Sequence, residues 1–261
     1  MASFNHVSGQ YLQVEESRIY YEVAGDRSKQ PLLLLHGGLG SLTDFNSIMS
    51  QLPPQFYFIG IDLRGHGKST LGTLPLTYQR YQHDVEAVLT HLGITSCSVL
   101  GFSDGGIVAY RMAAAQSVKI DKLITVGAQF QLDRNGPVFE MLSGLTADMW
   151  QQMDPESVDA YKAVNPEPDF DTLVNAVVGL WTDTATSGYP GQQIRQITAP
   201  LLLIRGDHDH LLSLEEVSAL RQQLPQTHFF NIPFAEHEVH KDAPELFLKV
   251  VNDFLLAKDI D

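Results

Sequence analysis

The chain has 261 residues, 44% of them hydrophobic and 18% charged, a composition that fits one large folded α/β domain and excludes global disorder. Its formal net charge of −14 argues against nucleic acid or an anionic membrane as a partner, because both bind basic surfaces. The single cysteine, Cys97, excludes an intrachain disulfide, and the first ten residues lack the features of a secretory signal, so we expect a cytoplasmic protein.

The N-terminal third predicts a hairpin followed by a buried strand. Residues 11–14 and 18–23 alternate as two short strands, and residues 32–35 form a continuous aliphatic run. Such a run is typical of a strand covered on both faces of a parallel sheet, and it is too short to cross a bilayer. The sequence HGGLGS follows directly, and its glycines allow backbone amides to approach a ligand closely. The N–H of Gly38 is therefore a candidate oxyanion donor, the alternative being an ordinary tight turn between a strand and a helix.

The next elements are a strand at 56–61 and a helix at 78–92 that stops at Gly93. In the polar loop between them, His66 is interpreted as a residue that anchors the loop. The apolar positions of the helix define its buried face, which leaves His83 and His91 at the surface or its boundary.

A strand-to-helix turn at residues 101–105 carries the strongest chemical signal of the chain. The sequence GFSDG lies between an apolar run at 97–100 and a helix-forming segment at 107–115, which is the context that a nucleophile elbow requires. In such an elbow Ser103 adopts a strained conformation that exposes its hydroxyl, and the two glycines let strand and helix close around it. The helix N-terminus and the N–H of Asp104 then face a developing oxyanion. The alternative is a chance G-x-S-x-G in a glycine-rich loop. Cys97, inside the strand, is interpreted as a small buried hydrophobe.

After a strand at 122–126 the alternation of strands and helices is interrupted. Residues 131–195 contain short amphipathic pieces with apolar faces, which predict an inserted helical lid between two parts of the core, residues 1–130 and 196–261. The alternation then resumes with strands at 200–205 and 228–232 and helices at 214–224 and 244–256. The expected fold is α/β, with a mostly parallel eight-stranded sheet, helices on both faces and sites at the carboxyl ends of strands.

Two loops after these late strands supply an acid and a base for the serine. A serine hydroxyl needs a base within hydrogen-bond reach, and that base needs an orienting acid. The first loop offers Asp207 or Asp209 and the second offers His237 or His240, in the order Ser, Asp, His of an α/β-hydrolase. A metal site is the alternative chemistry, but the spacing matches no zinc pattern that we can argue. The residues that such a site would use are Asp207, His208, Asp209, His210, His237 and His240.

The motifs LLLLHGG, DLRGHGKS, GFSDGG, LLLIRGDHD and IPFAEHEVH, in this order over nearly the whole chain, resemble the α/β-hydrolase superfamily. In that family the catalytic acid is the Asp of a G-x-x-D turn, which implies Asp209. The catalytic His lies in a P-x-A-x-H stretch, which implies His237. A proline that often follows the acid is absent here. The resemblance implies a catalytic triad of Ser103, Asp209 and His237, an oxyanion hole from the N–H groups of Gly38 and Asp104, and no cofactor or metal.

The sequence says less about the substrate than about the catalytic residues. The GFSDGGI stretch, the VGAQF strand and the length are similar to valacyclovir hydrolase-like (biphenyl hydrolase-like) enzymes, in which the acid equivalent to Asp104 receives the ammonium of an amino-acid ester. The alternative role for Asp104 is to stabilise the helix N-terminus. We therefore expect an enzyme of class EC 3.1.1 that hydrolyses a small carboxylic ester with water, as a monomer or small homo-oligomer. The alternatives are a carbon–carbon bond hydrolase, a lactonase, a perhydrolase or a weakly catalytic small-molecule receptor.

Overall fold

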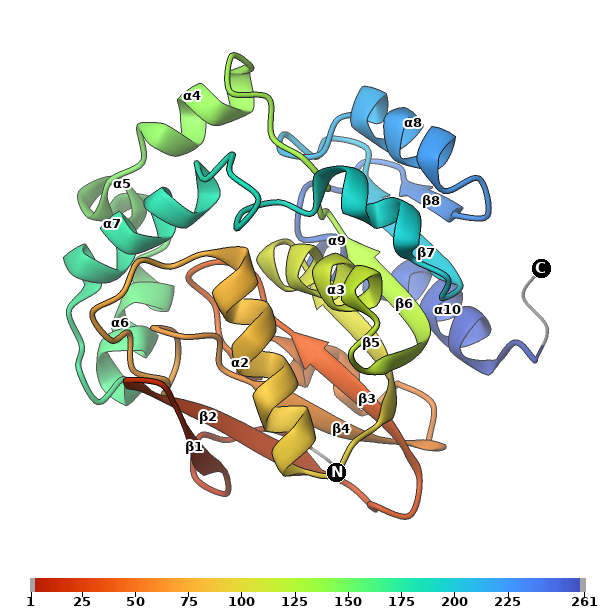
Figure 1. Ribbon diagram of the computed structural model, residues 1–261, viewed down its shortest axis with the longest axis horizontal. Helices are drawn as coiled ribbons and strands as arrows, with labels where there is room; N and C mark the ends of the chain where they lie inside the picture. Colours follow the sequence, from red (N-terminus) through yellow and green to blue (C-terminus); the bar gives the residue numbers. More distant parts are fainter. Residues whose placement is uncertain (1–2, 259–261) are drawn as a thin grey trace.

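The computed structural model of the chain describes residues 3–258, and its centre is one eight-stranded sheet (Figure 1). The strand order is β1-β2-β4-β3-β5-β6-β7-β8, with β1 and β2 antiparallel, β2 antiparallel to β4 and every later pairing parallel. This confirms the predicted sheet, including the N-terminal hairpin. The strands are β1 (Gln10–Val14), β2 (Ser17–Ala24), β3 (Gln30–Leu35), β4 (Phe56–Ile61), β5 (Ser96–Phe102), β6 (Lys119–Val126), β7 (Leu201–Gly206) and β8 (His228–Ile232).

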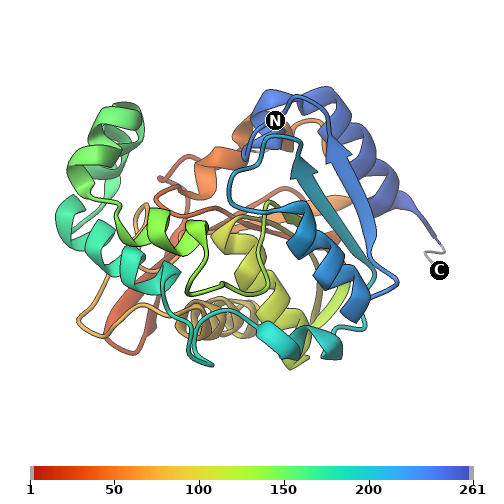
Figure 2. The ribbon, with the colours of Figure 1, turned by 90° about the horizontal axis from the view of Figure 1, so that it is seen from above.

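Helices connect the strands and cover both faces of the sheet, and four more form an insertion (Figures 1 and 2). The connecting helices are η1 (Leu42–Phe45), α1 (Asn46–Met49), α2 (Tyr78–His91), α3 (Asp104–Ala115), η2 (Gly191–Gln196), α8 (Leu214–Gln223), α9 (Val239–Asp242) and α10 (Pro244–Leu256). The inserted helices are α4 (Pro137–Ser143), α5 (Ala147–Met153), α6 (Pro155–Val164) and α7 (Phe170–Trp181). The short helices η1, α1 and α9 lie within segments for which the sequence predicted no helix.

Alternate residues of each buried strand face opposite sides of the sheet, because side chains along a strand have a period of two. Leu33 and Leu35 of β3 join the apolar cluster under α2, α3 and α8, whereas Leu32 and Leu34 join the cluster under α1 and α10. All four leucines are fully buried. The continuous aliphatic run therefore belongs to a strand covered on both faces, as its sequence predicted.

The inserted helices α4–α7 leave the sheet after β6 and return before β7. In Figure 2 they gather at one side of the molecule, away from α10. The N–H of Gly191 donates to the carbonyl of Phe130 at 2.8 Å, which joins the two ends of the insertion. The Arg111 guanidinium, from α3, donates to the carbonyls of Thr186 and Gly188 and fixes the returning segment to the core.

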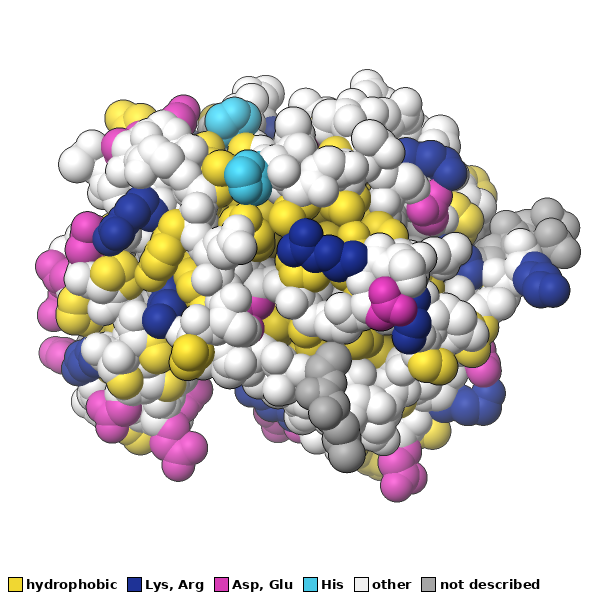
Figure 3. Space-filling model, turned by 90° about the horizontal axis from the view of Figure 1, so that it is seen from below, with side chains coloured by type: hydrophobic (Ala, Val, Ile, Leu, Met, Phe, Trp, Pro, Cys, Tyr) yellow, Lys and Arg dark blue, Asp and Glu magenta, His cyan; other side chains and the backbone are white. Residues whose placement is uncertain are grey.

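The surface seen from below in Figure 3 carries acidic and basic side chains separated by hydrophobic ones, so the net negative charge is not gathered into one acidic field on this face. Within residues 3–258, no helix is long and apolar enough to cross a membrane.

Candidate active site

Ser103 lies at the tip of the turn between β5 and α3, with a φ of 49° and a ψ of −116°. A positive φ is strained for a residue with a side chain, and it persists only where the surroundings enforce it. Here the N–H of Ser103 donates to the carbonyl of Val126, and its own carbonyl accepts from the N–H groups of Gly106 and Ile107. The residue is partly exposed, and its hydroxyl makes no capping hydrogen bond to the helix that it begins.

Two glycines make this turn sterically feasible. A Cβ at Gly105 would lie 2.1 Å from the carbonyl oxygen of Leu35, and a Cβ at Gly101 would lie 2.4 Å from the carbonyl oxygen of Gly105. Both contacts are with backbone, which has little freedom to move. The elbow therefore depends on glycine at both positions, as the motif predicted.

His237 and Asp209 form a side-chain pair at the ends of β8 and β7. The Nδ1 atom of His237 lies 3.0 Å from Oδ1 of Asp209, while Nε2 of His237 is buried with no protein partner. Burial raises the pKa of Asp209, but the hydrogen bond with His237 and those from the N–H groups of Leu212 and Leu211 outweigh it and hold the pKa below its usual value. Asp209 is thus a carboxylate that can orient an imidazole and stabilise its charged form.

The rival acid and base occupy different environments. Asp207 is exposed and accepts from the amide of Asn231. His240 is buried among the rings of Phe45, Phe102 and Phe247, and this burial lowers its pKa to about 3. A base that stays neutral and enclosed in this way has no route to a substrate.

Asp104 links the elbow to the inserted helices. Its carboxylate accepts from the indole Nε1 of Trp181 at 2.9 Å to both oxygens and from the hydroxyl of Tyr78 at 2.7 Å, and only 2% of the residue is exposed. Burial raises its pKa, which the two donors partly counter. A Cβ at Gly38 would lie 2.6 Å from the Trp181 ring and 2.7 Å from Oδ2 of Asp104, so the Gly38 backbone packs directly against this cluster.

A cavity of about 550 Å³ joins these groups. Ser103, His237, Gly38 and Asp104 line it from the core, and α4, α5 and α7 line it from the insertion. Its size is that of a site for a small molecule. A serine at a strained elbow, a histidine paired with an aspartate and the backbone of Gly38 therefore meet at one cavity.

Residues 30–180 match the family described as the alpha/beta hydrolase fold. The chain belongs to the α/β-hydrolase family.

Relatives and a solved structure agree with this membership. The chain is 27% identical over 253 residues to the AB hydrolase superfamily protein YisY of Bacillus subtilis (strain 168), covering 87% of this chain and 91% of that protein. It is 24% identical over 239 residues to the esterase YbfF of Escherichia coli (strain K12), covering 87% and 94%. The solved structure of a meta-cleavage product hydrolase mutant from Pseudomonas fluorescens IP01, complexed with acetates, has a TM-score of 0.80 at 17% identity, covering 96% of this chain and 98% of that one.

In this α/β-hydrolase, Gly127 is a site residue that the sequence reasoning missed. It follows β6 with a φ of 59°, and a Cβ there would lie 2.7 Å from Cε1 of His237 and 3.1 Å from Oδ2 of Asp209. Only glycine leaves room for the paired acid and base at this point. The signal was a glycine directly after a buried strand, the same signal that identified Gly38.

The histidines outside this site differ in environment. His66 is buried, its Nδ1 lies 3.1 Å from the carbonyl of Arg64, and burial lowers its pKa to about 3, in agreement with an anchoring role. His83 and His91 are exposed, as expected. Cys97 is fully buried, and burial raises the pKa of its thiol to about 12. Within residues 3–258, no three His, Cys, Asp or Glu side chains are grouped to hold a metal ion.

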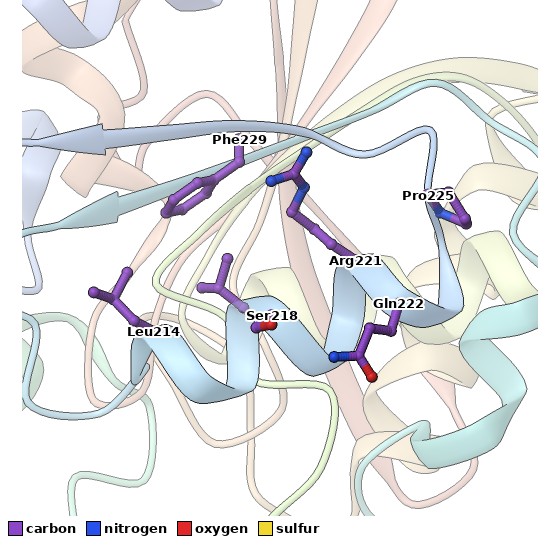
Figure 4. Close-up of a pocket in the computed structure, with 7 residues that line it drawn as sticks. Leu214, Ser218, Arg221, Gln222, Pro225 and Phe229 are labelled. Carbon is purple, nitrogen blue, oxygen red and sulfur yellow. The ribbon is translucent and has the colours of Figure 1, made fainter.

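A second hollow, of about 460 Å³, lies between α8 and β8. Figure 4 shows Arg221 pointing from α8 toward β8, where Phe229 lies, with Leu214 at the start of the helix. The seven residues that line this hollow include Ser218 but no base paired with an acid, so they cannot activate a serine for acyl transfer.

Proposed function

We propose that this α/β-hydrolase is a serine hydrolase that cleaves a small carboxylic ester through an acyl-enzyme. The observation that carries the proposal is the pair of Asp209 and His237, because His237 lines the same cavity as Ser103 and its Nε2 has no protein partner. The name of the similar Escherichia coli protein, an esterase, supports the same reaction class.

In the proposed mechanism, Nε2 of His237 removes the hydroxyl proton of Ser103 while Oγ of Ser103 attacks the ester carbonyl. Asp209 fixes the ring through Nδ1 and stabilises the imidazolium that forms. The N–H groups of Gly38 and Asp104 hold the oxyanion, and loss of one such donor typically costs about 3 kcal/mol of transition-state stabilisation. His237 then gives its proton to the leaving alcohol, and a water molecule activated by His237 hydrolyses the acyl-enzyme.

Replacement of the nucleophile tests the proposal. We expect the purified protein to hydrolyse 4-nitrophenyl acetate and to be labelled by a fluorophosphonate probe, and Ser103→Ala to lose both while keeping its circular dichroism spectrum. Ser218→Ala, at an exposed serine of α8, is the matched control and should keep both. Turnover by Ser103→Ala at the unmodified rate would exclude the mechanism.

An α-amino acid ester is the narrower substrate hypothesis that Asp104 raises. The Asp104 carboxylate already accepts from Trp181 and Tyr78 and is 2% exposed, so a substrate ammonium would have to reach an oxygen that these side chains surround. We propose to compare valine 4-nitrophenyl ester with its N-acetylated form. Faster hydrolysis of the free amine supports an ammonium site at Asp104. Equal rates for the two esters would mean that Asp104 serves only to accept the hydrogen bonds from Trp181 and Tyr78.

A further inference from the structure

The cavity side of the inserted helices has an apolar face that no part of the described protein covers. Helix α5 contains no buried residue, yet Met149, Trp150 and Met153 all line the cavity. Met149 and Met153 are 47% and 61% exposed, and their spacing of four places them on one side of the helix. Met141 of α4, 43% exposed, and Leu145 continue this face along the cavity wall.

The charges around the same cavity are strongly one-sided. Among the described residues that line it, Lys241 is the only Lys or Arg, and its ammonium is paired with Glu238 at 2.6 Å. Five acids stand in the lining besides the enclosed Asp104: Asp44, Asp154, Glu236, Glu238 and Asp242. A ligand group that carries its own carboxylate meets repulsion there, because the acids outnumber the one lysine and that lysine is already paired.

We infer that the face formed by Met141, Met149 and Met153 binds an uncharged apolar chain of the ester, and that the acidic lining selects against chains ending in a carboxylate. This inference rests on the proposed function and names the substrate class of the same site. Methionine side chains are unbranched and flexible, so they adapt to ligands of different length. The expected enzyme therefore accepts a range of chain lengths and favours the longer ones.

The first experiment measures kcat/KM for two series of esters. One series has 4-nitrophenol as the alcohol and acyl groups from acetate to octanoate, and the other has acetate as the acid and alcohols from methanol to octanol. We expect kcat/KM to rise by up to about fourfold per methylene in one series, the value for full burial of a methylene. The series that rises identifies which half of the ester lies along the methionines.

Substitution of the methionines tests their part. We expect Met149→Gln combined with Met153→Gln to lower the ratio of kcat/KM between the eight-carbon ester and the shortest ester of the rising series about tenfold or more. Leu246→Gln is the matched control, because Leu246 is 51% exposed but lies on α10, away from the cavity. The control should leave that ratio unchanged. An equal change in both variants would overturn the role of the methionines.

The second experiment compares 4-nitrophenyl octanoate with the mono-4-nitrophenyl ester of octanedioic acid. We expect the neutral ester to be favoured about tenfold or more, and the preference to shrink in 0.5 M NaCl, because salt screens the acidic lining. Glu236→Gln combined with Glu238→Gln should shrink the preference too, whereas Glu245→Gln, at an exposed acid of α10, should not. Equal use of the two esters by the unmodified enzyme would overturn the charge selection.

Labelling by the fluorophosphonate probe separates the possible failures. A protein that is labelled and turns over acetate, but shows no dependence on chain length in either series, refutes the inference alone. A protein that is neither labelled nor active on any ester refutes the proposed function, and the inference falls with it.

Discussion

The elbow at the end of β5 and helix α5 of the insertion differ in how closely they are packed. Around the elbow, the positions of Gly101 and Gly105 leave no room for a methyl group, and most neighbouring side chains are fully buried. In the insertion, α7 buries six residues but α5 buries none, and a Cβ at the exposed Gly179 of α7 would meet nothing within 4 Å. The backbone is thus held rigidly at the elbow, where bonds would break, whereas the side chains of α5 can adapt to a substrate chain. Enzymes commonly place a reactive site on a rigid scaffold and determine specificity with more variable segments.

The largest expected effect comes from the acid at the strand ends. Asp209→Asn keeps the oxygen that accepts from the N–H groups of Leu211 and Leu212, but it removes the charge that orients and stabilises the His237 ring. We expect kcat to fall about 10⁴-fold, as for the equivalent change in a serine protease triad. Steady-state hydrolysis of 4-nitrophenyl acetate measures it.

The control for this change lies in the insertion. Asp159→Asn, at an exposed acid of α6, should keep kcat within about twofold, since surface changes away from such networks have small effects. Similar losses in both variants would mean that charge in general, and not the Asp209 pair, supports the reaction.

A pair of glycine substitutions sharpens the contrast in packing. Gly105→Ala forces a methyl group against the carbonyl of Leu35, and we expect a loss of about 3 kcal/mol or more in the free energy of unfolding. Gly179→Ala, in an open helical position, should stabilise by about 0.5–1 kcal/mol, because alanine restricts the unfolded chain. Urea denaturation measures both, and effects of the same sign would contradict the difference in packing.

Substitutions of Trp181 and Trp150 test the contact between the elbow and the inserted helices. Trp181→Phe removes the indole donor from the enclosed Asp104 carboxylate, and we expect a loss of about 2 kcal/mol in the free energy of unfolding together with a lower kcat. Trp150→Phe removes only a bond to the Ser157 hydroxyl and should cost about 1 kcal/mol. An unchanged free energy of unfolding and an unchanged kcat for Trp181→Phe would show that Asp104 does not depend on the insertion.

The smallest expected effect is on the pH dependence of stability at the junction of the regions. Glu216 of α8 accepts from the N–H of Phe130, and burial raises its pKa to about 8. In the folded protein Glu216 therefore keeps its proton at pH values where the unfolded chain has already released it. The stability that the protonated Glu216 contributes is complete below about pH 4.5 and is lost as pH rises toward 8.

Glu216→Gln keeps a hydrogen-bond acceptor and cannot ionise. We expect the variant to gain about 1 kcal/mol in the free energy of unfolding relative to the unmodified protein between pH 5 and pH 8, since solvent reaches this partly buried side chain. Denaturation curves at several pH values measure the gain. A difference that stays constant with pH would remove Glu216 as its source.

The sequence predicted the parts of the fold that local pattern controls. The aliphatic run of β3 and the G-x-S-x-G turn were visible because strand burial and elbow strain each demand a short, characteristic set of residues. All eight predicted strands are present, and Ser103 has the strained backbone that its motif predicted. The roles assigned to Ser103, Asp209 and His237 stay predictions until the substitutions are made.

What the sequence could not predict depends on contacts between distant segments. The indole of Trp181 reaches Asp104 across 77 positions of the chain, and no local pattern marks that pair. Gly127 looks like any glycine after a strand until His237 and Asp209 are seen beside it. The open face of α5 was equally hidden, because an amphipathic helix predicts burial without saying whether another helix or a ligand covers it.

The hydrogen bond between Gly191 and Phe130 has a consequence for engineering. Because the segment it closes leaves and rejoins the core at nearly the same point, residues 131–190 can be exchanged as a cassette without changing the register of β6 and β7. Chimeras that graft this segment from another hydrolase onto the present sheet would test whether it carries substrate preference, and they would need an indole at position 181 to keep the donor to Asp104.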